Sequence, residues 1–168
     1  YAPTPDRFRS AMGRFVTGVV VMTSVGADGE PHAMTANAVT SVSLDPVLLL
    51  VCVDRDATMA EVIAEADHFA LNVLSLEQQT LSSWFADANR PEGAAQFEGV
   101  DLAEANAASP VLAEALAWFD CRVWARYDGG DHVIVVGEVV GLAETTDAEA
   151  EPLVFDRGRY SRVIDETG

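Results

Sequence analysis

Residues 35–46, which read TANAVTSVSLDP, carry side chains suited to holding a polar ligand between two apolar runs of the chain. Hydroxyl and amide groups donate hydrogen bonds to phosphate or carbonyl oxygens, and small alanines allow a flat ring to approach the backbone. The donors are Thr35, Asn37, Thr40, Ser41 and Ser43. The same pattern also fits an ordinary strand with hydroxyls on its solvent face, so the segment alone leaves both interpretations open.

His132 is the second residue that could do chemistry, because it follows a turn at residues 128–131 and stands beside Asp131. A neighbouring carboxylate can orient an imidazole toward a ligand, but the residues alone favour an exposed turn histidine. The spacing of His32 and His68 relative to it does not indicate a metal triad, so we expect no metal site. Dinucleotide, nucleophile-elbow and phosphate-loop motifs are absent from the sequence.

The formal charge of −17 arises from 27 acidic and 10 basic side chains, and every basic one is an arginine. A surface of this sign repels polyanions, so we expect no nucleic-acid partner. The lack of lysine excludes a Schiff-base or phosphate-loop lysine. The densest group of cations is Arg157, Arg159 and Arg162, which suits either a phosphate site or a solvated tail.

Apolar periodicity predicts a mainly β chain with a few helices. Strands are expected at residues 19–25, 47–53, 69–74, 119–127 and 132–142. Helices are expected from Pro5, at residues 58–65, and after a capping box of Ser75 and Gln78. Turns at residues 28–29 and 128–131 indicate hairpins. An antiparallel barrel with peripheral helices therefore fits better than a doubly wound sheet.

Two segments carry more specific expectations about packing. Residues 47–53 are almost unbroken apolar, which predicts a strand buried on both faces or inside a barrel. Residues 86–109 have weak periodicity and many small or acidic residues, so we expect an excursion over the surface. A lid or a dimer arm is an equally good interpretation of that stretch.

Length and composition bound the remaining possibilities. The chain has 168 residues, 49% of them hydrophobic, which suits one domain spanning residues 1–168. Cys52 and Cys121 lie in separate apolar segments without metal or disulfide spacing, which favours the reducing cytoplasm. No apolar run approaches the roughly 20 residues that cross a bilayer, so we expect no membrane contact.

Five ordered blocks resemble the flavin reductase-like family with a flavin-binding split β-barrel. They are FRSAMGRFVTGVVVMTS at 8–24, MTANAVTSVSLDPVLLLVCVDR at 34–55, FALNVLS at 69–75, GDHVIVVGEV at 130–139 and PLVFDRGRYSR at 152–162. The resemblance implies a homodimeric enzyme, the small component of a two-component flavin monooxygenase. Such an enzyme uses NADH or NADPH to reduce FMN or FAD, which then leaves for a separate monooxygenase. A split barrel with a fixed prosthetic flavin, or a non-catalytic flavin or haem carrier, is the alternative.

The resemblance also implies roles for individual residues. Those implied to line the flavin ring and ribityl chain, or to lie close to the ribityl chain and phosphate, are Thr35, Ala36, Asn37, Ser41, Val42 and Ser43. Those implied to approach the phosphate from the segment after the central strand are Cys52, Val53, Asp54, Arg55 and Thr58. Arg159 and Tyr160 would face the flavin, and His132 would lie where the nicotinamide binds and act in catalysis.

Overall fold

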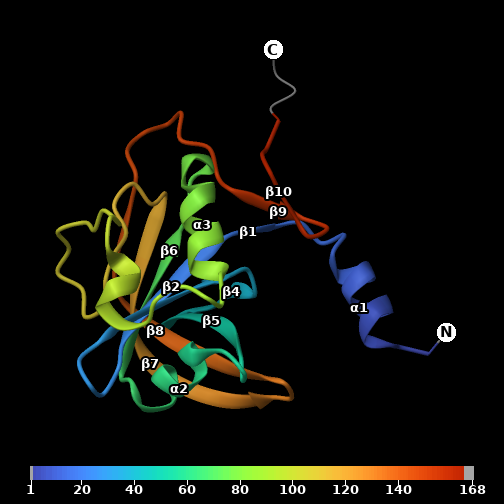
Figure 1. Cartoon of the computed structure of the whole chain (residues 1–168), viewed down its shortest axis with the longest axis horizontal. Coiled ribbons are helices and arrows are strands. Elements are labelled where there is room, and N and C mark those ends of the chain that lie inside the picture. The colour runs from blue at the N-terminus through green and yellow to red at the C-terminus, as the bar shows by residue number, and fades with distance from the viewer. Residues whose placement is uncertain (1, 165–168) are drawn as a thin grey trace.

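The computed structural model describes residues 2–164 and folds them mainly into antiparallel strands with peripheral helices (Figure 1). The strands are β1 Thr17–Gly18, β2 Val20–Val25, β3 Pro31–Ala36, β4 Val39–Leu44, β5 Val47–Asp54, β6 His68–Val73, β7 Ala117–Gly129, β8 His132–Glu144, β9 Val154–Asp156 and β10 Arg159–Ser161. The helices are α1 Pro5–Met12, α2 Thr58–Glu65 and α3 Gln79–Ala86, with 3-10 turns η1 Leu76–Gln78 and η2 Gly93–Phe97. The predicted fold class is confirmed.

The larger sheet has the strand order β3-β2-β6-β7-β8-β5-β4, and all its neighbouring strands are antiparallel. Side chains from β2, β5, β6, β7 and β8 meet in one core cluster with Met59 and Ile63 of α2, so the sheet coils around this cluster. Over residues 2–164, no pairing joins the two edge strands β3 and β4. This open arrangement fits the expected split barrel. A smaller sheet has the order β1-β9-β10.

Strand β2 separates two cores, because successive side chains of a strand point to opposite faces. Val20 and Met22 join the cluster that contains α2. Val21 joins a second cluster that contains Phe85 of α3 and Ala33 of β3. The edge strand β3 therefore lies between α2 and α3, with one long side open.

Both predicted hairpins are present, and their turns follow the residues that signalled them. Between β2 and β3, Gly29 has a φ of +82°, and the Glu30 amide donates to Oδ1 of Asp28 over 3.0 Å. Between β7 and β8, Gly130 has a φ of +79° in a two-residue turn that leads into His132. Glycine tolerates this left-handed backbone without steric cost, which fixes the place where each strand ends.

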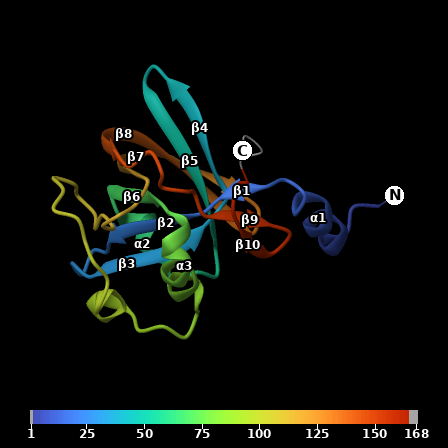
Figure 2. The same cartoon turned by 90° about the horizontal axis from the view of Figure 1, so that it is seen from above.

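Of the two alternatives expected for the strand at 47–53, burial on both faces is wrong, and a strand on the inside of a split barrel agrees with the structure. Leu49, Val51 and Val53 are buried in the core that the sheet encloses, but the side chains between them are only partly covered, and Val47 is 44% exposed. Strands β5 and β4 project together from the body of the molecule (Figure 2). Within residues 2–164, therefore, alternate side chains of β5 are buried and the others are only partly covered.

The stretch at 86–109 is mostly exposed in its first half, as expected for a surface excursion, but one buried side chain anchors it to the sheet. Turn η2 packs on β3, and the buried Gln96 accepts a hydrogen bond from the Ala33 amide over 3.0 Å. The indole N–H of Trp84 donates to the Gln96 carbonyl over 2.8 Å. This segment therefore covers the open side of β3 in part.

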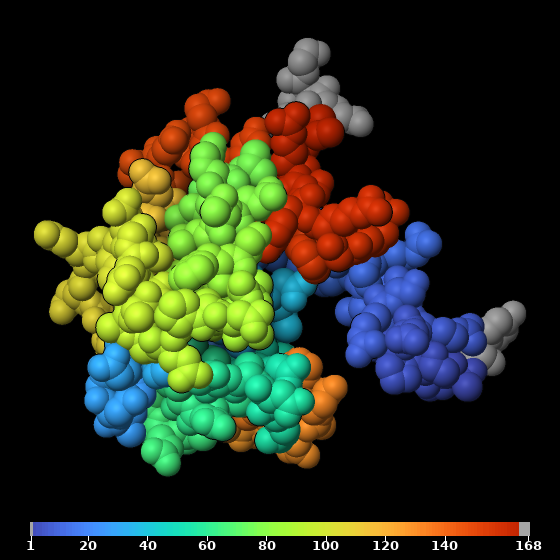
Figure 3. Space-filling view, in the orientation of Figure 1, coloured from blue at the N-terminus to red at the C-terminus, as the bar shows by residue number. Residues whose placement is uncertain are grey.

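Helix α1 begins as predicted, with the Thr4 hydroxyl accepting a hydrogen bond from the Arg7 amide over 3.4 Å. Its apolar side chains are not buried: Phe8 is 63% exposed and Met12 is 49% exposed. In the space-filling view the N-terminal segment forms a lobe set apart from the main body (Figure 3). Within residues 2–164 no side chain of α1 is buried, so the apolar face of this amphipathic helix is available to a partner.

Candidate functional site

The last residues of β3 lie beside α3 and β10, and hydrogen bonds hold the three elements together. The Thr35 hydroxyl donates to the Ser82 carbonyl over 2.6 Å. The hydroxyls of Ser82 and Tyr160 share a hydrogen bond of 2.8 Å. Thr35, Ala36, Asn37 and Tyr160 line a cavity of about 200 Å³ with apolar walls from Val19, Ala86 and Phe155. The structure thus brings four of the expected flavin residues together.

A second cavity, of about 410 Å³, opens along the free side of β3 and also includes Thr35. Residues 56–59, at the start of α2, form one wall, and the segment that contains Arg90 and Gln96 forms another. Ala57 is the N-cap of α2 and provides no side-chain hydrogen bond to the first turn. The first amides of a helix are unsatisfied within it and attract anions. Thr58 is placed here as expected, next to those amides.

Arg90 lines the larger cavity and was missed by sequence reasoning. Its guanidinium donates to the backbone carbonyls of Ala33 and Asp87 and, over 3.5 Å, to the Gln96 side chain. Partial burial lowers the pKa of Arg90, and the nearby carboxylates of Asp87 and Glu92 oppose this shift. The group remains a cation that neutral oxygens hold at the cavity. The only local signal was an Arg-Pro pair in a stretch poor in basic residues.

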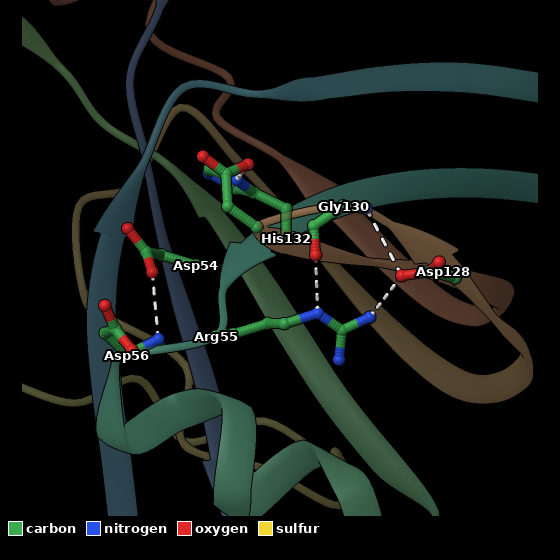
Figure 4. Close-up of polar contacts among 7 residues, drawn as sticks. Asp54, Arg55, Asp56, Asp128, Gly130 and His132 are labelled. Atoms are coloured by element: carbon green, nitrogen blue, oxygen red, sulfur yellow. Dashed lines mark hydrogen bonds and ion pairs between the residues drawn. The ribbon is translucent and has the colours of Figure 1, made fainter.

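His132 lies at the start of β8, opposite Asp54 of β5 (Figure 4). Its Nδ1 is 2.7 Å from Oδ1 of Asp131. The hydrogen bond from His132 lowers the pKa of the Asp131 carboxyl, so this carboxylate is an acceptor and Nδ1 carries the proton. The imidazole is 39% exposed, and its Nε2 is the nitrogen left for a ligand.

Arg55 follows β5 and reaches the turn between β7 and β8, as Figure 4 shows. Its Nε donates to the Gly130 carbonyl over 2.8 Å, and its Nη2 donates to Oδ1 of Asp128 over 2.6 Å. This bond lowers the pKa of the Asp128 carboxyl. The guanidinium, expected near the flavin phosphate, therefore binds the hairpin turn in this structure.

The other residues of β5 that were expected to approach the phosphate are Cys52, Val53 and Asp54. Val53 is fully buried in the core. The Cys52 amide donates to the Ala38 carbonyl over 2.9 Å, and burial raises the pKa of the Cys52 thiol. Asp54 accepts a hydrogen bond from the Asp56 amide over 2.9 Å at the turn before α2. Cys52, Val53 and Asp54 line neither cavity at β3.

Strand β4 holds Ser41, Val42 and Ser43, which line neither cavity at β3. The pairing with β5 shifts between Ser41 and Ser43, so Val42 is the extra residue of a β-bulge. Val42 is 48% exposed on this edge strand. The structure therefore separates these three residues from the group around Thr35.

Arg159 lies at the β9–β10 turn, where it lines a hollow of about 300 Å³ with Arg157 and Tyr160. Arg157 is engaged by Asp156, with 2.9 Å between its Nη2 and Oδ2 of the carboxylate. That hydrogen bond lowers the pKa of Asp156. Tyr160 thus connects this arginine pair to the smaller cavity at β3.

Metal binding and membrane crossing are two further possibilities for residues 2–164. No group of three or more histidine, cysteine, aspartate or glutamate side chains is arranged to hold a metal ion within that range. In the same range, none of the helices combines the length and the apolar character needed to cross a membrane.

Comparison with known proteins gives matches over nearly the whole chain. An NADH-dependent FAD reductase of Streptomyces globisporus is 42% identical over 158 residues, which cover 93% of this chain and 84% of the relative. An NADH-dependent FMN reductase of Streptomyces nodosus subsp. asukaensis is 40% identical and covers 97% and 87%.

A solved structure has the same fold. It is BorF, the flavin reductase component of a bacterial two-component tryptophan halogenase, with a TM-score of 0.87 and 39% identity. The alignment covers 96% of this chain and 99% of BorF. Residues 12–163 match the family described as Flavin reductase like domain. The coiled open sheet, the cavities at β3 and these matches agree, and the chain belongs to the flavin reductase-like family.

Proposed function

We propose that this protein is an NAD(P)H:flavin oxidoreductase, which transfers a hydride from NADH or NADPH to FMN or FAD. The observation that carries the proposal is the position of Thr35, which borders both cavities along the free side of β3. The smaller cavity measures about 200 Å³ and the larger about 410 Å³, and the larger one is within the size range of small-molecule sites. The hydroxyls, amides and one cation around them suit a flat, phosphate-bearing ligand.

The residues present fit a flavin. Ala33 turns its amide and carbonyl outward from β3, where Gln96 and Arg90 bind them. Thr35 lies two residues further along, so its backbone groups face the same side and can bond the polar edge of the ring. Ala36 leaves room for the ring face, and Asn37 donates from the end of the strand. Arg90 and the first amides of α2 would hold the phosphate.

The hydride step needs no protein nucleophile, because nicotinamide and flavin supply the redox chemistry once bound. The protein aligns the two ring systems and excludes water. We assign His132 to the nicotinamide, with Nε2 as its contact and Asp131 fixing the proton on Nδ1. Residues of β4 and Arg159 remain proposed flavin contacts that a conformational change or a second copy of the chain would bring to the ligand.

We also propose a homodimer, supported by large apolar side chains that this chain leaves exposed. Leu44 of β4 is 90% exposed, and Leu142 of β8 is 59% exposed. Val42, Val47 and the apolar side chains of α1 are exposed as well and offer further contacts for a second copy. Burial in a dimer would also explain why the outer face of β5 is apolar.

The proposed product, reduced flavin, is a substrate for a separate flavin-dependent monooxygenase. BorF is likewise the flavin reductase component of a two-component system, in which the other component is a tryptophan halogenase. We place the reaction in the cytoplasm, because Cys52 and Cys121 are both free thiols. We treat residues 1–168 as one domain of this kind.

The test is the loss of NADH or NADPH absorbance with FMN, FAD or no flavin added. Turnover that saturates with free flavin is expected, and it would identify both preferred cofactors. A protein that stays yellow through dialysis and shows no turnover with any combination would instead be a flavin carrier. That result would overturn the proposed activity.

A further inference from the structure

We propose that Arg55 is a positioning residue that fixes the turn between β7 and β8 and, through Asp131, the imidazole of His132. This inference rests on the proposed function of His132 as the nicotinamide contact. It also changes the role of Arg55 from a phosphate ligand to a clamp between the end of β5 and the β7–β8 turn.

Three hydrogen bonds connect Arg55 to the turn. Its side chain donates to the Gly130 carbonyl over 2.8 Å and to the Asp128 carboxylate over 2.6 Å. Its backbone amide donates to the Asp131 carbonyl over 3.0 Å. The Asp128 carboxylate also accepts from the Gly130 amide over 3.2 Å, so one oxygen bridges the clamp and the turn.

The β7 side of this turn lacks a second neighbouring strand, whereas the β8 side has one. The pairing of β6 with β7 ends at Arg122, but β7 continues to Gly129. Strand β8 stays paired with β5 up to His132, which lies opposite Asp54. Arg55, which directly follows β5, extends this support from β5 across β8 to the turn. Tyr127 near the tip is 57% exposed, so little apolar burial holds it.

The clamp acts on His132 through a single residue. The Asp131 carbonyl is held by Arg55, and its carboxylate lies 2.7 Å from Nδ1 of His132. The Asp131 carboxylate is 93% exposed, so it contributes direction to the imidazole only if the backbone that carries it is fixed. The backbone amide of Arg55 binds the Asp131 carbonyl, and its side chain binds the carbonyl of the preceding residue, Gly130. The side-chain contact is the part of this fixation that a substitution at position 55 removes.

The surroundings of Arg55 argue against a phosphate contact. It lines a hollow of about 360 Å³ between α2 and Arg126, and not the cavity that contains Thr35 and Thr58. Its charge is already paired with Asp128, whose pKa it lowers. A phosphate at Arg55 would have to displace that carboxylate.

The experiment compares Arg55→Ala with Arg122→Ala by steady-state kinetics and by amide hydrogen exchange. Arg122 is a matched control, because it pairs with Glu138 across the same two strands, away from the turn. For Arg55→Ala we expect the KM for NADH to rise about five-fold, as the loss of an exposed charged contact allows, with the flavin KM unchanged. Exchange at Asp131 and His132 should accelerate by a similar factor. In Arg55→Lys both effects should be smaller than in Arg55→Ala, because one ammonium group can still donate to part of the turn.

Different results would overturn the inference. A higher flavin KM with an unchanged NADH KM would make Arg55 a phosphate contact. Equal kinetics and equal exchange for the Arg55→Ala and Arg122→Ala proteins would show that the clamp positions nothing. If the wild-type protein reduces no flavin, the proposed function fails. The exchange comparison still decides whether Arg55 fixes the turn.

Discussion

Replacing Arg90 by methionine removes the cation from the larger cavity at β3 and keeps a flexible apolar stem in its place. The guanidinium is held by carbonyl oxygens of Ala33 and Asp87 and by the Gln96 side chain. These acceptors are neutral, and the carboxylates of Asp87 and Glu92 lie near the guanidinium without a hydrogen bond to it, so its N–H groups can be shared with an anion in the cavity. We expect the substitution to weaken the binding of FMN much more than the binding of riboflavin, which has no phosphate.

The magnitude follows from the exposure of the group. A hydrogen bond to a charged partner contributes about 1.5–3 kcal/mol, and partial solvent exposure moves the value toward the lower end. About 1.4 kcal/mol corresponds to a ten-fold change in affinity. We therefore expect the preference for FMN over riboflavin to fall about ten-fold in Arg90→Met, and only slightly in Arg90→Lys.

The assay is a fluorescence titration of each flavin into the wild-type and variant proteins. Riboflavin serves as the internal control, since distortion of β3 by the lost hydrogen bonds weakens both ligands alike. The wild-type preference should also shrink as salt is added, because the half-exposed cation is screened. An Arg90→Met protein with the wild-type ratio of the two affinities would refute the phosphate assignment.

Four further predictions concern the nicotinamide and the stability of the fold. His132→Ala should raise the KM for NADH and leave the flavin Kd unchanged, and a collapse of flavin binding would contradict its role. Gly137→Ala should lower stability by about 1–3 kcal/mol in urea unfolding, because a Cβ there would lie 2.5 Å from Phe69 and 2.8 Å from Cys121. Burial and, secondarily, Asp120 raise the pKa of the Cys121 thiol from 9.0 to about 12. Because the folded state favours the neutral thiol, this group's contribution to stability is fully present below pH 9 and is lost between pH 9 and 12. Thermal unfolding of Cys121→Ala should accordingly depend less on pH in that window than the wild type. Arg126 donates to the carbonyls of Ile63 and Ala66 at the end of α2 over 2.8 and 2.6 Å. Arg126→Met should therefore lower the free energy of unfolding by about 1 kcal/mol and accelerate amide hydrogen exchange in α2. Unchanged exchange would show that α2 does not need these contacts.

The turns and the helix starts were predictable from sequence because their signals are local. Gly29 and Gly130 adopt the left-handed backbone that their turns require. The capping box of Ser75 and Gln78 is present in the structure, with the Ser75 amide donating to the Gln78 side chain over 3.1 Å. In each case the residues that interact are at most three positions apart, so the pattern contains the whole interaction.

The errors concern interactions between distant parts of the chain. Arg90 was missed because its acceptor, the Ala33 carbonyl, lies 57 positions away and belongs to the backbone. Gln96 looked like a surface residue, yet it satisfies the Ala33 amide on the free side of β3. The strand at 47–53 was expected either to be covered on both faces or to lie inside a barrel, and its composition alone could not decide between the two. Arg55 follows a strand near the site, and only the fold directs it to a turn 75 residues away.

The few cations of this chain share one kind of hydrogen-bond partner. In a chain of charge −17, Arg55, Arg90 and Arg126 each donate to backbone carbonyls, at a turn, at β3 and at the end of α2. Carbonyl oxygens at element ends cannot be satisfied by the element itself and would otherwise depend on water. Carbonyl partners also leave a guanidinium its full charge, whereas a carboxylate cancels it. Of the three, Arg55 forms an ion pair with Asp128, so its role is structural. Arg90 has the carboxylates of Asp87 and Glu92 nearby, but its side-chain hydrogen bonds go to neutral oxygens at a cavity. The partner of each arginine, more than its position in the sequence, therefore separates the clamp from the proposed phosphate contact.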